Sequence, residues 1–251
     1  MGNNTSNHQL MNAVIAGNLQ KIKRLVKQGA NIHYKNDYAV RSASQNGYLN
    51  VVKYLVEHGA NIHADDDCAI RIASENGHLE IVKYLVEHGA DIHTKNDSAV
   101  CWASACGHLD VVKYLVEYGA NIHADDDYAI RLASKDGHLD VVKYLVEQGA
   151  DIHAKNDDAF HWAFHKRHLE VVEYLKSLSC GKINYPVKPE GFRFRNNKEC
   201  PITQEILTDE IEKVGCSQCK NVFNKEALEI WFNQSGKKCP FRCENAEFYE
   251  I

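Results

Sequence analysis

Residues 38–67 have the sequence YAVRSASQNGYLNVVKYLVEHGANIHADDD, and closely related sequences follow four more times along the chain. The later copies begin at Cys68, Ser98, Tyr128 and Asp158, so the period is 30 residues. Self-similarity at one fixed period is typical of a solenoid, in which each repeat contacts only its neighbours. Such a stack has an extended surface and no catalytic crevice of its own. The sequence therefore predicts a binding protein.

The copy at residues 98–127 shows how each unit is expected to fold. Asp97 stands at the N-cap position of a first helix, where its carboxylate can accept amide hydrogens of the first turn. Gly107 ends that helix, because a helix C-terminus commonly needs a residue in the left-handed region. The core-facing stripe of the second helix is predicted to be Val111, Val112, Leu115 and Val116.

Two short helices cannot bury their apolar faces alone, so neighbouring units are expected to complete the core by stacking. We predict six helix pairs in residues 1–180, with a degenerate copy at each end. In the last copy Arg167 replaces the glycine that ends the first helix, as expected of a capping repeat. All 14 histidines precede residue 169 and all four prolines follow residue 185, which predicts a domain boundary near Cys180.

The segment GHLEIVKYLVEHGADIH, residues 77–93, closely resembles the second half of an ankyrin repeat. The resemblance covers roughly residues 5–180 and implies a mostly α-helical solenoid that binds a protein on its concave face. The family repeat has about 33 residues, so the β-hairpin between these shorter units is expected to be stunted. Arrays of 30-residue units also resemble those encoded by large DNA viruses, which implies an intracellular protein, in the simplest case cytoplasmic.

The resemblance also implies which residues contact the partner. In ankyrin arrays, the residues at the start and the end of the first helix line the concave face, and here they vary from unit to unit. The predicted partner-binding residues are Tyr38, Gln45, Glu75, Ser98, Ala105, Tyr128, Lys135 and His165. Neutral drift at exposed positions would produce the same variation, so both interpretations stay open at this point.

Histidine and arginine also recur in columns. The columns are His33, His63, His93, His123 and His153, and Arg41, Arg71 and Arg131. Packed helices lie ~8–10 Å apart, so one imidazole per repeat cannot share a metal ion with the next. We expect both columns to form hydrogen bonds between repeats. The loop acids at 65–67 and 125–127 are expected to be solvated and partly paired with the arginines, and Cys68, Cys101 and Cys106 to behave as small hydrophobes.

The net charge of −5 arises in residues 1–180, where 18 Lys and Arg stand against 23 Asp and Glu. Without a basic stripe, nucleic acid is not an expected partner. No apolar run reaches the roughly 18 residues that span a bilayer, and the N-terminus lacks the apolar stretch of a signal peptide. Residues 1–6 match the M-G-x-x-x-[ST] pattern, so Gly2 is a candidate site of N-myristoylation, which alone supports only weak, reversible membrane association.

Residues 200–251 form a candidate metal-binding module, which an extended linker at 181–199 joins to the array. A module of about 50 residues buries little surface, and a structural metal is a common remedy. Four thiolates suit one tetrahedral Zn²⁺. The predicted ligands are Cys216, Cys219, Cys239 and Cys243, spaced as C-x₂-C and C-x₃-C. A zinc-free mini-domain with buried cysteines is the alternative.

The sequence around these cysteines resembles the RING and U-box group of ubiquitin-ligase domains. The features are Cys200-Pro201-Ile202-Thr203 before the first pair and Cys239-Pro240 at the second. The resemblance implies a small α+β domain that recruits a ubiquitin-conjugating enzyme and acts by proximity, without a nucleophile of its own. The implied docking patch is Ile202, Trp231 and Pro240.

One of the two zinc sites of a RING domain is missing, because the partners of Cys200 would fall on Thr203, Asn224 and Ala227. The tail is therefore most similar to one-zinc SP-RING domains and zinc-free U-boxes. Two functions stay open from the sequence. One is an adaptor that brings a bound target to a conjugating enzyme. The other is a non-enzymatic interaction protein with a degenerate zinc module.

Overall fold

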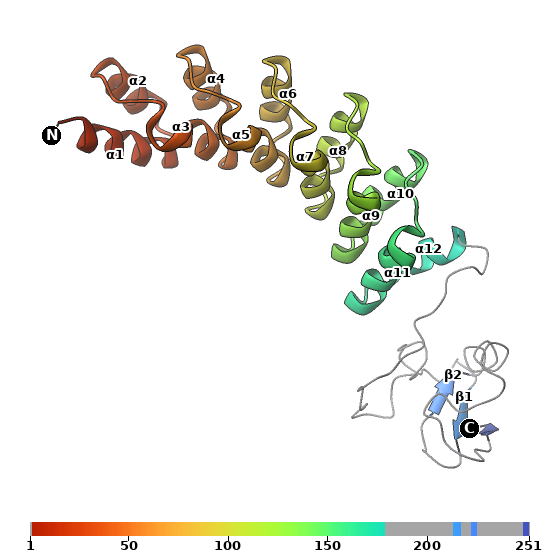
Figure 1. Ribbon diagram of the computed structural model, residues 1–251. Helices are drawn as coiled ribbons and strands as arrows, with labels where there is room; N and C mark the ends of the chain where they lie inside the picture. Colours follow the sequence, from red (N-terminus) through yellow and green to blue (C-terminus); the bar gives the residue numbers. More distant parts are fainter. Residues whose placement is uncertain (1, 179–212, 217–221, 225–247, 251) are drawn as a thin grey trace. The chain divides into compact units, whose positions relative to one another are not determined.

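The structure is a computed structural model that describes residues 2–178, 213–216, 222–224 and 248–250. The chain divides into two compact units, Met1–Asn184 and Tyr185–Ile251. The described part of the first unit is a curved stack of helix pairs (Figure 1). Residues 2–178 contain the six predicted helix pairs and no strand, so the hairpins that were expected to be stunted have no β-strands in this part of the chain.

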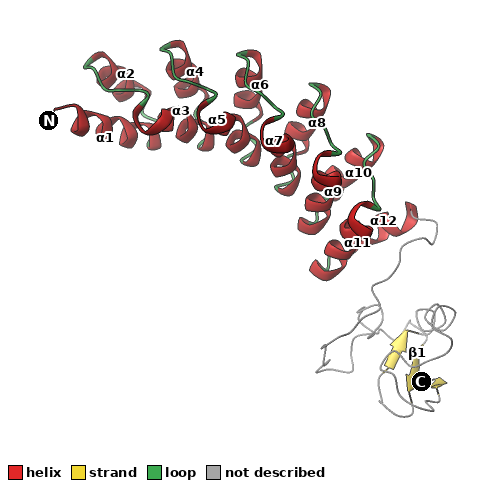
Figure 2. Ribbon diagram, in the orientation of Figure 1, coloured by secondary structure: helices red, strands yellow, loops and turns green. Residues whose placement is uncertain are grey.

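The odd-numbered helices form one row on the inner side of the curve, and the even-numbered helices form the outer row (Figure 1). The inner row is α1 (Gly2–Ile15), α3 (Tyr34–Gln45), α5 (Ala64–Glu75), α7 (Thr94–Ala105), α9 (Ala124–Asp136) and α11 (Ala154–Lys166). The outer row is α2 (Leu19–Lys27), α4 (Leu49–Glu57), α6 (Leu79–Glu87), α8 (Leu109–Glu117), α10 (Leu139–Glu147) and α12 (Leu169–Leu178). Short loops join the helices of each pair and each pair to the next (Figure 2).

The hydrophobic core runs between the two rows. In α8 the predicted stripe is confirmed at Val111, Val112 and Leu115, which are completely buried, whereas Val116 is half-buried. Facing positions of α7 carry small residues such as Ala99 and Ala103, which let neighbouring helices approach closely. Each fully buried leucine contributes roughly 1.5–3 kcal/mol relative to an exposed one, so the stack is stabilised mainly by these repeated apolar contacts.

An aromatic ring from the next pair covers the glycine that ends each inner helix. Gly77 has a φ of +72°, and a Cβ atom added there would lie 2.5 Å from Nδ1 of His108. The imidazole of His108 donates through Nε2 to the carbonyl oxygen of Glu75, 3.0 Å away. The rings in this column are Tyr48, His78, His108, His138 and His168. This column, which the sequence analysis did not single out, links successive pairs.

In the last unit Arg167 takes the place of the covered glycine. It keeps the left-handed conformation, with a φ of 63°, and ends α11. Within residues 2–178 no seventh pair follows to place a ring over this position. An arginine side chain is therefore tolerated here, which is consistent with the predicted capping repeat.

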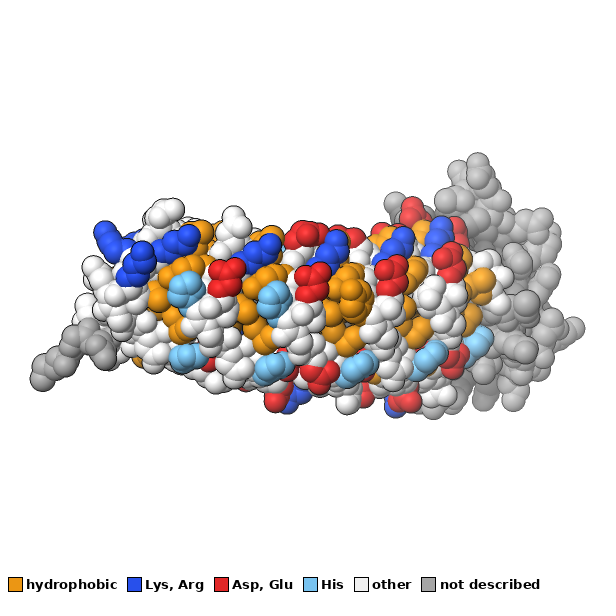
Figure 3. Space-filling model, turned by 90° about the horizontal axis from the view of Figure 1, so that it is seen from above, with side chains coloured by type: hydrophobic (Ala, Val, Ile, Leu, Met, Phe, Trp, Pro, Cys, Tyr) orange, Lys and Arg blue, Asp and Glu red, His pale blue; other side chains and the backbone are white. Residues whose placement is uncertain are grey.

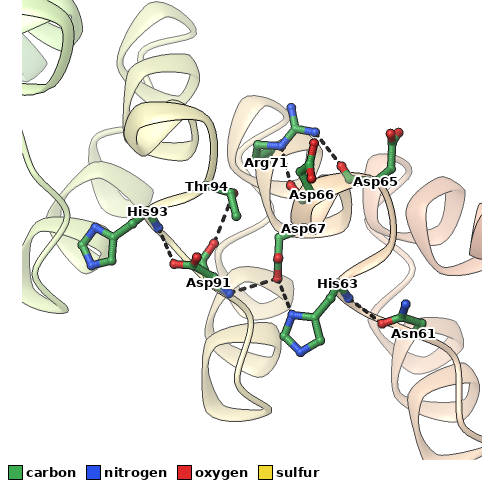
Figure 4. A network of polar contacts seen from close by, with 9 residues as sticks. All are labelled: Asn61, His63, Asp65, Asp66, Asp67, Arg71, Asp91, His93 and Thr94. Atoms are coloured by element: carbon green, nitrogen blue, oxygen red, sulfur yellow. Dashed lines mark hydrogen bonds and ion pairs between the residues drawn. The ribbon is translucent and has the colours of Figure 1, made fainter.

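Three left-handed residues open each inner helix from α3 onwards, at 35–37, 65–67, 95–97, 125–127 and 155–157. This conformation costs roughly 1–2 kcal/mol for each residue with a side chain, although Asn and Asp tolerate it best. Arginine offsets part of the cost. Arg71 donates through Nε to the carbonyl oxygen of Asp66 (3.0 Å) and through Nη2 to that of Asp65 (2.9 Å) (Figure 4).

The arginine column also links successive pairs, as predicted. Nη1 of Arg41 lies 3.1 Å from the Asp65 carboxylate, and Nη1 of Arg131 lies 2.9 Å from that of Asp158. Both carboxylates belong to the next inner helix along the stack. All three arginines therefore hold the turn that opens their own helix, and Arg41 and Arg131 also contact the next inner helix.

The third residue of each left-handed turn is a buried aspartate, and in α3, α5, α7 and α9 this aspartate also accepts a backbone N–H of the next pair. Oδ1 of Asp67 accepts from Nδ1 of His63 (2.9 Å) and from the backbone N–H of Asp91 in the next pair (3.0 Å) (Figure 4). A carboxylate oxygen only accepts, so Nδ1 of His63 carries the proton. These two donors offset the cost of removing the carboxylate from water.

Three expectations about these residues are wrong. The Oδ1 atom of Asp97 bonds to His93 and to the N–H of Asn121, and not to the first turn of its own helix. The histidines of the predicted column donate within their own unit, and the aspartate makes the link between units. Asp67 is buried at 5% exposure and not solvated. In each case the next pair supplies the amide that draws the carboxylate inward.

In the second unit the described residues form a three-stranded sheet of order β2-β1-β3. The strands are β1 (Lys213–Cys216), β2 (Val222–Asn224) and β3 (Phe248–Glu250). Both pairings are antiparallel, with Val214 opposite Phe223 in β2 and opposite Glu250 in β3. Cys216 is thus the last residue of β1, directly before the connection to β2.

Candidate binding face on the inner helices

The predicted partner-binding residues all lie on the inner helices α3, α5, α7, α9 and α11. Tyr38, Gln45, Glu75 and His165 are exposed, and Ser98, Ala105, Tyr128 and Lys135 are half-buried. We call these eight residues, together with Trp102 and Trp162, the inner face. The predicted residues thus all lie on the inner row of helices, and all of them are at least partly accessible to solvent.

Sequence reasoning missed the two tryptophans. Trp102 lies one helical turn after Ser98 on α7, and its side chain is 42% exposed. In the 30-residue frame this position reads Ser42, Ile72, Trp102, Leu132 and Trp162. The column varies as much as those chosen from the resemblance, and its large aromatic residues were the available signal.

Two cationic side chains of the preceding pair lie over the Trp162 ring. The guanidinium carbon of Arg131 lies 5.4 Å from the centroid of the Trp162 ring, and the Lys135 ammonium lies 5.9 Å from it. A cation within about 6 Å of an indole centroid is attracted by the ring quadrupole. Arg131 is itself buried and paired with Asp158. Within the stack, Trp162 therefore has its cations already in place.

Acidic groups surround the middle of the inner face. Burial, followed by the carboxylates of Asp97 and Asp125, raises the pKa of the Cys101 thiol to about 12. The pKa of Cys106 is also raised, first by partial burial and then by Glu75 and Asp136. Cys68 and Cys101 are buried as predicted for small hydrophobes, whereas Cys106 is exposed, so the prediction is wrong for Cys106.

The outer helices present a regular pattern. Lys23, Lys53, Lys113 and Lys143 each lie 5.5 or 5.6 Å from the ring centroid of a tyrosine in the next pair. Seen from above, Lys, Arg and acidic side chains line one edge of the stack, and apolar side chains lie in the middle together with some histidines (Figure 3). Further histidines lie towards the other edge, near a few charged side chains. This regularity contrasts with the variable side chains of the inner face.

The candidate residues of the tail are placed only in part. Cys216 ends β1. The other predicted ligands and the predicted docking patch lie outside the described residues, at Cys219, Cys239, Cys243, Ile202, Trp231 and Pro240. Gly2, the candidate lipidation site, is the first residue of α1. Among the described helices, none has the length and apolarity to cross a lipid bilayer.

A comparison with protein families finds one match in the helical stack. A family model described as "Ankyrin repeats (3 copies)" matches residues 10–96, 65–126 and 100–186. These three stretches overlap and together extend over the stack of helix pairs. No curated protein matches the chain.

Proposed function

The chain belongs to the ankyrin repeat family, and from this premise we propose that its inner face binds a target protein. Ankyrin repeats support a role in protein–protein interaction, and the stack offers an extended surface for it. The inner face combines aromatic rings and charged side chains that change from repeat to repeat. Interface hot spots are enriched in Trp, Tyr and Arg.

One observation carries the choice of the inner face over the outer row. The outer row repeats the same lysine–tyrosine contacts along the stack. On the inner face, by contrast, one position of the unit is Gln45, Glu75, Ala105, Lys135 and His165 in successive repeats. A surface that distinguishes one partner from others needs non-repeating chemistry. The inner face has such non-repeating side chains.

The inner face is tested with binders selected from a displayed random peptide library on the full chain. Replacing Tyr38, Gln45, Tyr128 and His165 by alanine is expected to weaken most binders about tenfold or more, because hot-spot truncations cost over 1 kcal/mol each. The matched control replaces Asn50, Glu57, Glu117 and Glu147, all exposed on outer helices. Affinities are measured by titration calorimetry, and folding is checked by circular dichroism. Binders that respond only to the control would locate the binding surface on the outer row.

For the tail we propose a RING/U-box-like module that holds one structural zinc through Cys216, Cys219, Cys239 and Cys243. The antiparallel pairing of β1 and β2 supports this proposal, because Cys216 ends β1 and Cys219 lies between the two strands in the sequence. C-x₂-C is a common spacing of zinc ligands. The module would dock a ubiquitin-conjugating enzyme through Ile202, Trp231 and Pro240.

Cys216→Ser is expected to remove both zinc and ubiquitin transfer, because a structural zinc contributes the folding energy of so small a module. Zinc is measured by elemental analysis and transfer with a panel of ubiquitin-conjugating enzymes. The intact chain should hold about one zinc. Ile202→Ala should keep the zinc, lose transfer and leave the inner-face binders unaffected. One zinc without transfer by any enzyme would favour the alternative, a non-enzymatic interaction protein with a degenerate zinc module.

A further inference from the structure

The repeats provide an internal comparison between two tryptophans of the inner face. Trp102 on α7 and Trp162 on α11 occupy the same position of the 30-residue unit. The preceding inner helix carries two residues at equivalent sequence positions relative to each of them. For Trp162 these are Arg131 and Lys135. For Trp102 they are Arg71 and Glu75.

The two sites differ in what covers the ring. Arg131 and Lys135 lie 5.4 and 5.9 Å from the Trp162 centroid. Among the described residues, no cation stands over Trp102, whose side chain remains 42% exposed. At the position of the lysine there is an exposed carboxylate, Glu75. At the same position of the unit, the indole ring is thus covered by cations in one repeat and exposed to solvent in another.

Arg71 does not fill the open site. Its guanidinium donates to the carbonyl oxygens of Asp65 and Asp66 in the left-handed turn. The exposed carboxylate of Asp66 lies close enough to Arg71 for this charge to help lower the pKa of Asp66, after the larger effect of Lys95. Arg131 makes the same two bonds at its own turn and still lies over Trp162, so these bonds do not distinguish the two sites. The difference between the sites is Lys135 beside Trp162 and Glu75 at the equivalent position before Trp102.

The charges near Trp102 favour a cation. Cys106 lies four residues after Trp102, and Glu75 and Asp136 are both close enough to raise the pKa of its thiol. A cation over the ring would gain the quadrupole attraction of the indole and the charge attraction of these carboxylates together. An anionic group would be repelled at the same place.

We infer that Trp102 and Glu75 form a receptor for an arginine or lysine side chain of the partner protein. The incoming cation would lie over the Trp102 ring as Arg131 and Lys135 do over Trp162, with Glu75 as its counter-ion. This inference rests on the proposed function, since it names the chemistry that the inner face selects. It commits the partner to a segment that presents at least one basic residue.

Glu75→Lys is the sharpest test, because it recreates beside Trp102 the lysine that covers Trp162. The probes are the selected library peptides, and affinities are measured by titration calorimetry. We expect basic residues to be enriched among the binders. Glu75→Lys and Trp102→Ala should each weaken them about tenfold or more. The matched control is Glu87→Lys, the same charge change at an exposed residue on the outer helix of the same pair, and it should leave affinity within about twofold.

A second measurement ties the effect to the partner's cation. Replacing the basic residue of a peptide by norleucine should cost about as much as Trp102→Ala, and the two changes together should cost little more than either alone. Peptides that bind the inner face but ignore both Glu75→Lys and the norleucine exchange would overturn this inference and leave the proposed function intact. Peptides that depend only on the outer-row control variant would overturn both.

Discussion

Leu115→Ala is expected to lower the free energy of unfolding by about 2–5 kcal/mol. Leu115 is completely buried on α8, which contacts its own partner α7 and the outer helices α6 and α10 of both neighbouring pairs. Truncation loses the transfer free energy of the side chain and leaves a cavity that helices on three sides must close.

The matched change is Leu25→Ala at the corresponding position of α2, in the first pair. Leu25 is also buried, at 3% exposure, but it belongs to the first helix pair of the stack. In a linear stack the stability is a sum of repeat and nearest-neighbour terms, so the loss at Leu25 should be smaller. Denaturant titration of both variants checks this. Equal losses at the two positions would contradict nearest-neighbour stacking.

Gly77→Ala is expected to cost about 2–4 kcal/mol, the second large effect. Roughly 1–2 kcal/mol comes from placing a side chain in the left-handed conformation. The remainder comes from overlap with the His108 ring, which must move and lose its hydrogen bond to Glu75.

Gly89→Ala separates the two contributions. Gly89 has a φ of +90°, but a Cβ atom there would meet nothing within 4 Å. Only the conformational cost of about 1–2 kcal/mol should therefore remain. In the His108→Ala background, Gly77→Ala should fall to the Gly89→Ala value. If thermal or denaturant unfolding gave the same cost for Gly77→Ala with and without His108, the ring would not be the cause.

The expectations that hold concern single helices and their order. Val111, Val112 and Leu115 are buried because their spacing alone puts them on one face of a helix. Gly107 adopts a positive φ because it must end α7. The arginine links between units were also predicted, but the expectations for the aspartates and histidines that join the units are wrong. Asp97 is the example, since its carboxylate serves an amide of the next unit and not its own helix.

For the candidate site, sequence comparison of the units found a variable face but not its most exposed aromatic residue. Ser98 and Ala105 were predicted because a known family uses their positions, and Trp102 between them was not. Its importance depends on exposure and on the absence of a cation among the described neighbours, as the contrast with Trp162 makes clear. Neither quantity is a property of one position in the sequence.

The 30-residue period by itself determined the solenoid, the number of helix pairs and where helices end, because hydrophobic spacing and helix-ending glycines act over a few residues. Only the tertiary structure decided which histidine column joins the pairs and which tryptophan stays open. His108 reaches Glu75, and Arg131 reaches Trp162, only because stacking brings residues about one repeat apart into contact. Such contacts depend on side-chain direction and burial, which spacing along the chain does not specify.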